Sequence, residues 1–417
     1  MSPVVGGCPP ESRTLPHGGG CRKDEKGLET RIDQLDAPCD RLVMAHRQHS
    51  TKKGLENRRV LAERAVHPAA AEAIVAWFPA AARDLPWRRR RSGYHALVSE
   101  LMLQQTQVSR VVEKFGPFVR RFPTAAALAA ASEDEVLTAW QGLGYYRRAR
   151  FLHAAAKAVV ERHGGRVPVD DHAALLALPG VGRYTAGAIA SIVAGARAPI
   201  VDGNVTRVFQ RLAARDGSAG DRAVTDWAWS EAERFVERAA DPAAANEGLM
   251  ELGATVCTPA APKCGGCPLA GVCRARREGM VDAIPAPKVR AARRELVLVT
   301  ARLVRESDDA VLLEQRPREG LWGGLWQPPA VESADGRELP ARAAAELLGL
   351  PATIALRAAG EVPFQTTHRS VVFVLFDARL KAGRAASALA RGGRQWVTRA
   401  AIGEFALSNA AKRVLRV

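Results

Sequence analysis

The sequence lacks any stretch of about eighteen or more apolar residues without a charge or a glycine break, so it predicts no membrane-spanning helix. It also lacks an apolar segment after its first residues, which argues against a secretory signal peptide. We therefore expect a cytoplasmic protein with no membrane partner. In that compartment the seven cysteines are reduced, and they are available to metals rather than to disulfides.

Acidic side chains are scarce relative to basic ones. The chain has 44 Asp and Glu against 60 Lys and Arg, which gives a formal net charge of +16. Such an excess favours a polyanionic partner, most often nucleic acid. The alternative is an arginine-rich surface that has no specific ligand. With 417 residues, 47% of them hydrophobic, the chain is long enough for two or three globular domains.

Composition divides the chain into four segments. Residues 1–66 are rich in glycine, proline and charge, which predicts a disordered leader. In 67–277, apolar residues return every three or four positions and strand-like alternation is absent, so an all-α domain is expected. Residues 278–292 contain prolines and basic residues and are interpreted as a linker. Residues 293–417 mix both patterns and predict an α+β domain. Its β-rich runs are 295–304, 311–314 and 371–376, and its helical stretch is 340–348.

Four of the cysteines are clustered near the end of the helical segment. Cys257, Cys264, Cys267 and Cys273 have the spacing C-x6-C-x2-C-x5-C. Four thiolates so close in sequence suit either zinc or an iron–sulfur cluster. A zinc ribbon usually brings together two C-x2-C pairs, whereas this loop has one such pair flanked by unequal gaps. A compact loop around a cube-shaped cluster fits better than zinc, and four free thiols are the third alternative.

A glycine-rich turn with Gly180 and Gly182 joins two helical segments in a predicted helix–hairpin–helix at 172–194. Glycine permits a positive φ and leaves the backbone amides unshielded, and amides at a helix start bind phosphate. Asp202 follows after about the length of one helix, and Asn204 lies two residues beyond it. Its carboxylate either acts beside the phosphate site or only caps the next helix.

Two further stretches carry candidate chemistry. Glu100 lies among apolar helical residues, where burial would raise its pKa toward that of a general acid; the alternative is a surface glutamate. Gln104 and Gln105 follow it, with side-chain amides that either read base edges or form a polar helix end. Tyr145 stands in a glycine-rich turn before three arginines, which suits stacking on bases, although it could be a core tyrosine.

Taken together and in this order, these motifs resemble the adenine DNA glycosylase (MutY) family of helix–hairpin–helix iron–sulfur DNA glycosylases. The resemblance extends over residues 70–417. The matching segments are LPWR (85–88), SELMLQQTQV (99–108), GLGYYRRAR (142–150), LPGVGRYTAGAI (178–189), VDGNVTRV (201–208), NEGLMELGATVCTP (246–259) and the four-cysteine loop.

The resemblance implies a monomeric, nucleoid-associated base-excision repair enzyme that binds duplex DNA. It implies a [4Fe–4S] cluster on the four cysteines, and hydrolysis of the N-glycosidic bond of adenine paired with 8-oxoguanine or guanine. Glu100 matches the acid that protonates adenine at N7, and Asp202 matches the carboxylate that stabilises the cationic sugar. Tyr184 and Asn204 match residues that support them. Trp87, Arg88 and Glu247 match the adenine pocket. Gln105 and Tyr145 match side chains that the family inserts into the base stack.

Tyr184 distinguishes two related chemistries. The sister family, endonuclease III, has a lysine at this position, and that lysine attacks the sugar. A phenol forms no Schiff base, so a monofunctional glycosylase is expected. The alternatives are a glycosylase/lyase for damaged pyrimidines and a non-catalytic DNA-damage binding protein.

The C-terminal segment resembles the family's Nudix-like domain, which recognises 8-oxoguanine. The stretch 321–326 (LWGGLW) carries this match. Residues 336–350 keep only Glu346 in the core of the Nudix metal helix, so the domain is expected to bind and not to hydrolyse pyrophosphate. Where many relatives have Phe-Ser-His in the lesion-reading loop, this chain has Thr366, Thr367 and His368, which keeps a hydroxyl and the imidazole but loses the aromatic ring.

Overall fold

The structure is a computed structural model that describes residues 65–287 and 292–417. Residues 1–64 of the expected leader and 288–291 of the expected linker lie outside the described residues. Within the described ranges, no helix is long and apolar enough to cross a bilayer.

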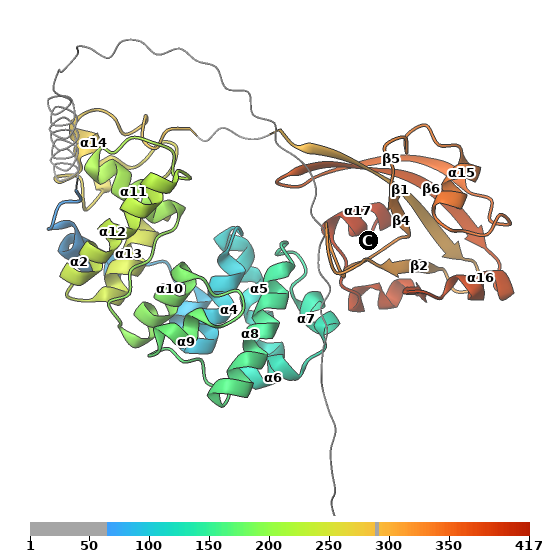
Figure 1. The fold of residues 1–417 in the computed structure, drawn as a ribbon, viewed down its shortest axis with the longest axis horizontal. Helices are drawn as coiled ribbons and strands as arrows, with labels where there is room; N and C mark the ends of the chain where they lie inside the picture. The colour runs from blue at the N-terminus through green and yellow to red at the C-terminus, as the bar shows by residue number, and fades with distance from the viewer. Residues whose placement is uncertain (1–64, 288–291) are drawn as a thin grey trace, which may run out of the picture. The chain divides into compact units, whose positions relative to one another are not determined.

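The first described part, 65–287, is helical throughout, as the sequence predicts (Figure 1). Its elements are α2 (Ala70–Ala81), α3 (Pro86–Arg89), α4 (Gly93–Leu103), α5 (Val108–Arg121), α6 (Ala125–Ala130), α7 (Glu133–Ala139), α8 (Arg147–His163), α9 (His172–Leu176), α10 (Arg183–Ala194), α11 (Gly203–Ala213), α12 (Arg222–Arg238), α13 (Pro242–Thr255), the 3₁₀ turn η1 (Cys264–Gly266) and α14 (Arg274–Arg277).

Two hydrophobic cores organise these helices. One is formed by α4, α5, α8 and α10, and the other by α2, α11, α12 and α13. Each core contains large side chains that are fully or almost fully removed from water, and their burial is the main source of stability. Examples are Leu101, Phe118, Trp140, Leu152 and Ile189 in the first core, and Ile74, Phe209, Phe235, Leu249 and Leu252 in the second.

The hairpin between α9 and α10 depends on a glycine at its tip. Gly180 has φ +76°, and a Cβ there would lie 2.5 Å from the Phe151 Cβ of α8. No other residue type fits both the backbone conformation and the close approach. Gly182 then precedes α10 with extended backbone. The hairpin is therefore fixed against α8 and sets the direction in which α10 enters the domain.

The chain after α14 packs onto the helical domain up to residue 287. Ile284 is buried against Ala214 and Ala275. The guanidinium of Arg211 donates from Nε to the carbonyl oxygens of Val281 and Ile284, at 3.1 and 2.8 Å. This part of the segment interpreted as a linker is thus held by apolar contacts and hydrogen bonds, which the prolines and basic residues of its sequence do not indicate.

The second described part, 292–417, contains a mixed seven-stranded sheet with order β3-β2-β1-β6-β5; β4 also pairs with β1, and β7 with β2. The central pair is parallel, from Arg294 opposite Arg369 to Arg305 opposite Leu380. The elements are β1 (Arg294–Arg305), β2 (Ala310–Gln315), β3 (Trp326–Gln327), β4 (Ala330–Glu332), α15 (Ala341–Leu347), β5 (Arg357–Gln365), β6 (Arg369–Leu380), α16 (Arg384–Leu389), β7 (Arg394–Val397), η2 (Arg399–Glu404) and α17 (Asn409–Leu415).

Alternate residues of β1 face two different cores, as the two-residue period of a strand requires. Val299 and Leu303 pack with Ala344 of α15, whereas Leu298 packs with Ala410 and its neighbours in α17. Helices therefore cover both faces of the sheet. This confirms the expected combination of an all-α domain and an α+β domain.

Candidate active site

A cavity of about 550 Å³ lies where the two helical cores meet. Its walls come from α3, α4, α10, the start of α11 and α13. The structure thus brings together residues that are more than 150 positions apart in sequence. The predicted site residues that line it are Trp87, Arg88, Glu100, Gln104, Gln105, Tyr184, Asp202, Asn204 and Glu247.

The other predicted residues lie outside this cavity. Gly180 and Gly182 form the α9–α10 hairpin, and Tyr145 stands in the turn before α8. Thr367 and His368 are in the short turn between β5 and β6. They belong to surfaces other than the cavity wall.

Glu100 is a buried acid of the cavity with a raised pKa. It is 6% exposed, and its Oε2 has no hydrogen-bond partner among the described residues. Burial raises its pKa to about 7, with a further rise from the charges of Asp202 and Glu247; the Tyr184 hydroxyl and Arg88 act in the opposite direction. A carboxyl group that is partly protonated near neutral pH, with a free oxygen at a cavity, has the properties of a general acid.

Asp202 caps the helix α11 and also lines the cavity. As the cap of α11 it accepts a hydrogen bond on Oδ1 from the Val205 N–H, at 2.7 Å. Its Oδ2 accepts from Asn204 Nδ2 at 3.1 Å. Burial raises the pKa of Asp202, while the hydrogen bonds from Val205 and Asn204 oppose that rise. The helix cap therefore fixes the orientation of a carboxylate that also lines the cavity.

The first turn of α11 is pressed against α13. A Cβ on Gly253 would lie 2.6 Å from the Asn204 Cβ, so only glycine permits this approach. Arg207 ties the two helices together by donating from Nη2 to the Gly253 carbonyl, at 2.8 Å, and to Asn204 Oδ1, at 3.0 Å. The position of Asn204, and through it that of Asp202, thus depends on α13.

Tyr184 contributes a neutral phenol. Burial raises the pKa of its hydroxyl well above the usual value, and the nearby charges of Glu100 and Asp202 raise it further. The hydroxyl donates a hydrogen bond to Met250 Sδ at 3.1 Å. Tyr184 can therefore donate a proton in a hydrogen bond, but it offers no amine for attack on a sugar.

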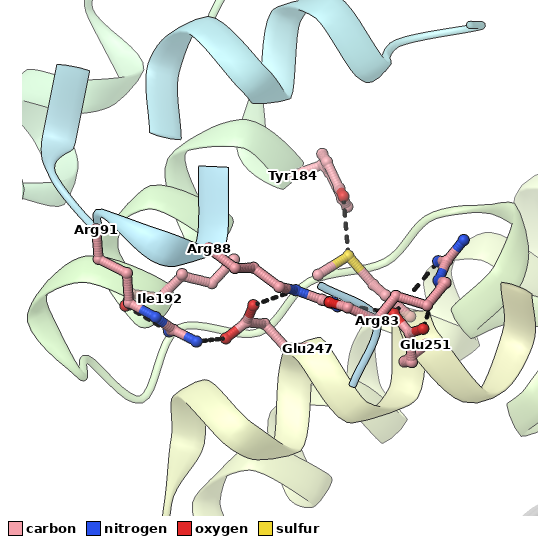
Figure 2. A network of polar contacts seen from close by, with 8 residues as sticks. Arg83, Arg88, Arg91, Tyr184, Ile192, Glu247 and Glu251 are labelled. Carbon is pink, nitrogen blue, oxygen red and sulfur yellow. Dashed lines mark hydrogen bonds and ion pairs between the residues drawn. The ribbon is translucent and has the colours of Figure 1, made fainter. Parts of the chain in front are cut away.

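Figure 2 shows a network of ion pairs on one wall of the cavity, between the segment around α3 and the helix α13. Arg88 contacts both Glu247 and Glu251, Arg83 contacts Glu251, and Arg91 contacts Glu247. Sequence motifs predicted only Arg88 and Glu247 of this set. The four-residue spacing of the two glutamates would place them on one face of a helix, which is the signal that could have identified Glu251.

Gln105 and Tyr145 share an unusual backbone conformation. Their φ angles are +55° and +45°, a left-handed region that side chains other than glycine rarely adopt. Arg148 connects the two turns: its Nη1 donates to the Met102 carbonyl at 2.7 Å and its Nη2 to the Gly144 carbonyl at 3.1 Å. Buried charge-assisted hydrogen bonds of this kind hold a strained backbone in place.

The four clustered cysteines line a second, small cavity together with Arg211. Arg211 Nη1 lies 3.3 Å from Cys257 Sγ. Burial raises the pKa of Cys267 to about 11 and also raises that of Cys273. No three or more His, Cys, Asp or Glu side chains among the described residues form a group suited to a single metal ion.

Comparison with known proteins identifies both domains. Residues 98–233 match the model of the HhH-GPD superfamily of base excision DNA repair proteins, and residues 300–417 match that of the NUDIX domain. The human adenine DNA glycosylase is 36% identical over 403 residues, which cover 82% of this chain and 73% of the human protein. The adenine DNA glycosylase of Mycolicibacterium smegmatis is 46% identical over 207 residues, or 49% of this chain and 69% of that protein.

Among solved structures, a thermostable thymine-DNA glycosylase is 28% identical, with a TM-score of 0.44 over 50% of this chain and 95% of that chain.

The helical fold, the cavity with its two carboxylates and the Nudix-like second domain define a helix–hairpin–helix DNA glycosylase of base excision repair. Within that class, the chain belongs to the adenine DNA glycosylase family. It is accordingly a hydrolase that acts on the N-glycosidic bond of adenine in DNA.

Proposed function

We propose that this enzyme removes adenine paired with 8-oxoguanine or guanine in duplex DNA, as a monofunctional glycosylase. The observation that carries the proposal is the pair of carboxyl groups in one cavity. Glu100 has a raised pKa and a free oxygen, and Asp202 is held by a helix cap. Breaking a glycosidic bond needs one group that protonates the leaving base and one that stabilises a cationic sugar.

In the proposed reaction, an adenine turned out of the helix enters the cavity. Protonated Glu100 donates its proton to N7, so that the base leaves as a neutral species and not as an anion. Asp202 stabilises the positive charge that develops on the sugar, and a water molecule completes the hydrolysis. Asn204 holds Asp202 in position through its Nδ2, and Tyr184 sits beside Glu100 as a neutral donor.

The base itself is proposed to lie against Trp87, Arg88 and Glu247. Trp87 is fixed by an edge-on contact with Phe115, with ring centroids 5.7 Å apart. The Glu247 carboxylate is held by Arg88 and Arg91 and lies at the cavity wall. A fixed carboxylate is a natural acceptor for the exocyclic amino group of adenine, which guanine and the pyrimidine carbonyls do not present in the same place.

We further propose a [4Fe–4S] cluster held by Cys257, Cys264, Cys267 and Cys273. The four thiols line one cavity, and their sequence has a single C-x2-C pair flanked by unequal gaps, which supports a cluster over a zinc ion. The raised pKa of two of these thiols means that they need a positive neighbour to become thiolates, and iron would be that neighbour. When bound, the cluster would cross-link the segment between α13 and α14 to itself.

The C-terminal domain is proposed to read the base opposite adenine. The turn between β5 and β6 places Thr367 and His368 in an exposed connection, where a hydroxyl and an imidazole can reach a partner. The helix α15 carries Glu346 as its single acidic residue, which supports recognition without pyrophosphate hydrolysis.

The test is the variant D202N in a single-turnover assay on duplexes that carry each mispair, with alkali added to reveal abasic sites. The amide oxygen can keep the cap to the Val205 N–H, whereas the amide nitrogen cannot accept from Asn204 and the charge that stabilises the sugar is lost. We expect base release to fall by at least ~10³-fold, with DNA affinity within about threefold of that of the parent protein. Unchanged release would refute the role of Asp202, and no release by the parent protein would refute the proposed function.

A further inference from the structure

Glu251 is a buried carboxylate of the cavity wall that the proposed chemistry does not use. It lies on α13, is 1% exposed and accepts three hydrogen bonds from arginines. Arg83 donates from Nε to Oε1 at 2.5 Å and from Nη2 to Oε2 at 3.2 Å, and Arg88 donates from Nη2 to Oε2 at 3.0 Å. Both oxygens are therefore engaged by arginines.

Arg88 connects Glu251 to the part of the wall that faces the base. Its Nε donates to Glu247 Oε1 at 3.1 Å, its Nη1 to the Arg83 carbonyl at 3.1 Å and its Nη2 to Glu251. Every nitrogen of this guanidinium is engaged, and the side chain is only 14% exposed. Figure 2 shows Arg88 between the two glutamates. Without Glu251, one end of the guanidinium would lose its anchor.

The network also sets the charge near Glu100. The charged and titratable groups that face Glu100 are Arg88 on α3, Tyr184 on α10, Asp202 at the start of α11 and Glu247 on α13. Arg88 favours the charged form of Glu100, and the two carboxylates oppose it. Three arginines and two glutamates leave the network with one excess positive charge, so the loss of either glutamate leaves two.

Building on the proposed function, we propose that Glu251 is a positioning residue for base release. It does not touch the base; it holds Arg88, the arginine that acts on Glu100, against Glu247 and balances the positive charge of Arg83 and Arg88. Glu251 thereby helps to keep Glu100 protonated at neutral pH.

Replacing Glu251 by glutamine tests this role because the side chain keeps its size and loses only its charge. The unbalanced arginines would then favour the ionised form of Glu100, so the acid would lose its proton at a lower pH. The quantity to compare is the rate of adenine release by the parent protein divided by that of E251Q. We expect this ratio to be at least ~10-fold larger at pH 8.5 than at pH 6. Single-turnover rates across this range, on full-length protein with saturating enzyme, measure the effect, and DNA affinity should stay within about threefold.

Glu231 offers a matched control. It is a buried glutamate of α12, 2% exposed, that accepts hydrogen bonds from Arg234 and from the Val66 N–H, and it does not line the cavity. E231Q should destabilise the fold much as E251Q does. Its ratio of the rates at pH 8.5 and pH 6 should nevertheless equal that of the parent protein. Equal ratios for E251Q and E231Q would overturn the proposal.

Arg83 provides a second test that does not depend on the folding of E251Q. Its side chain is 38% exposed, and R83Q removes one positive charge from the network. In R83Q, the pH at which activity is lost should rise. In the double variant R83Q/E251Q, that pH should return toward the parental value. E251D keeps the negative charge, so its ratio of rates at the two pH values should be that of the parent protein. A uniform drop in rate at every pH in these variants would indicate a purely structural role and overturn the proposal. If the parent protein releases no adenine at any pH, the proposed function itself fails.

Discussion

The carboxyl group of Glu100 is close to half protonated at neutral pH, because burial raises its pKa to about 7. The rate of base release should therefore fall as pH rises through about 7, by up to ~10-fold per pH unit, since only the protonated acid can donate to the base. Single-turnover rates from pH 5.5 to 9 test this prediction. A rate that is flat up to pH 9 would exclude Glu100 as the proton donor.

The same raised pKa makes Glu100 a cost to stability at high pH. The folded state favours the neutral form of Glu100. The contribution of Glu100 to the free energy of unfolding is therefore fully present below the unfolded pKa of about 4.5, and it is lost as pH rises through about 7. E100Q should thus be inactive but more stable than the parent protein at pH 9, by up to about 3 kcal/mol, with little difference at pH 4.5. Thermal unfolding at the two pH values measures this, and equal shifts at both would contradict it.

In the proposed mechanism, Tyr184 stands where an attacking amine would be needed for strand cleavage. Its phenol cannot form a Schiff base, so borohydride should trap no covalent complex between the parent protein and its substrate. In Y184K, a lysine would stand in the same cavity beside Glu100 and Asp202, and a trapped adduct should appear on a denaturing gel. A good yield of adduct with the parent protein would show that another amine attacks the sugar.

At the scale of elements, the contact between α11 and α13 positions the Asp202 carboxylate. In G253A the added Cβ would clash with Asn204, so the helices must separate, at a cost of ~1–3 kcal/mol. Because Asn204 holds Asp202, base release should also slow by at least ~10-fold. G403A is the control, since a Cβ at Gly403 meets no atom within 4 Å. Parental rates in G253A would show that the helix spacing does not govern the site.

The sequence predicts those elements whose apolar pattern reflects their burial. The strands β1, β2 and β6 have continuous apolar runs and are predicted, whereas β5 is mostly exposed and contains Gly360 and Pro363, so it has no apolar alternation. The pairing of Glu100 with Asp202 follows from the family resemblance and not from local pattern. The contacts of Glu251 with Arg83 and Arg88 span more than 160 residues, and only the fold brings them together.

At the scale of the whole molecule, the two described parts each have their own hydrophobic cores. A chain that ends at residue 287 should therefore fold and release adenine from guanine mispairs at a rate within about tenfold of that of the full-length protein. The proposed preference for 8-oxoguanine over guanine should drop by at least ~10-fold, because the proposed contacts of the C-terminal domain to the opposite base would be lost. Rates on the two mispairs, for both lengths of chain, provide the measurement. An unchanged preference would place recognition of 8-oxoguanine in the helical domain.

The left-handed turns of Gln105 and Tyr145 bear on how the enzyme searches DNA. Arg148 fixes both turns in the free protein, so their conformational cost is met during folding and not at each encounter. A repair enzyme tests very many intact base pairs for each damaged one. The family resemblance implies that Gln105 and Tyr145 insert into the base stack, so their backbone would already be held when they meet each pair, and weakly stacked pairs would yield first. The speed of the search then depends on the stiffness of the DNA, with no rearrangement of these turns to slow it.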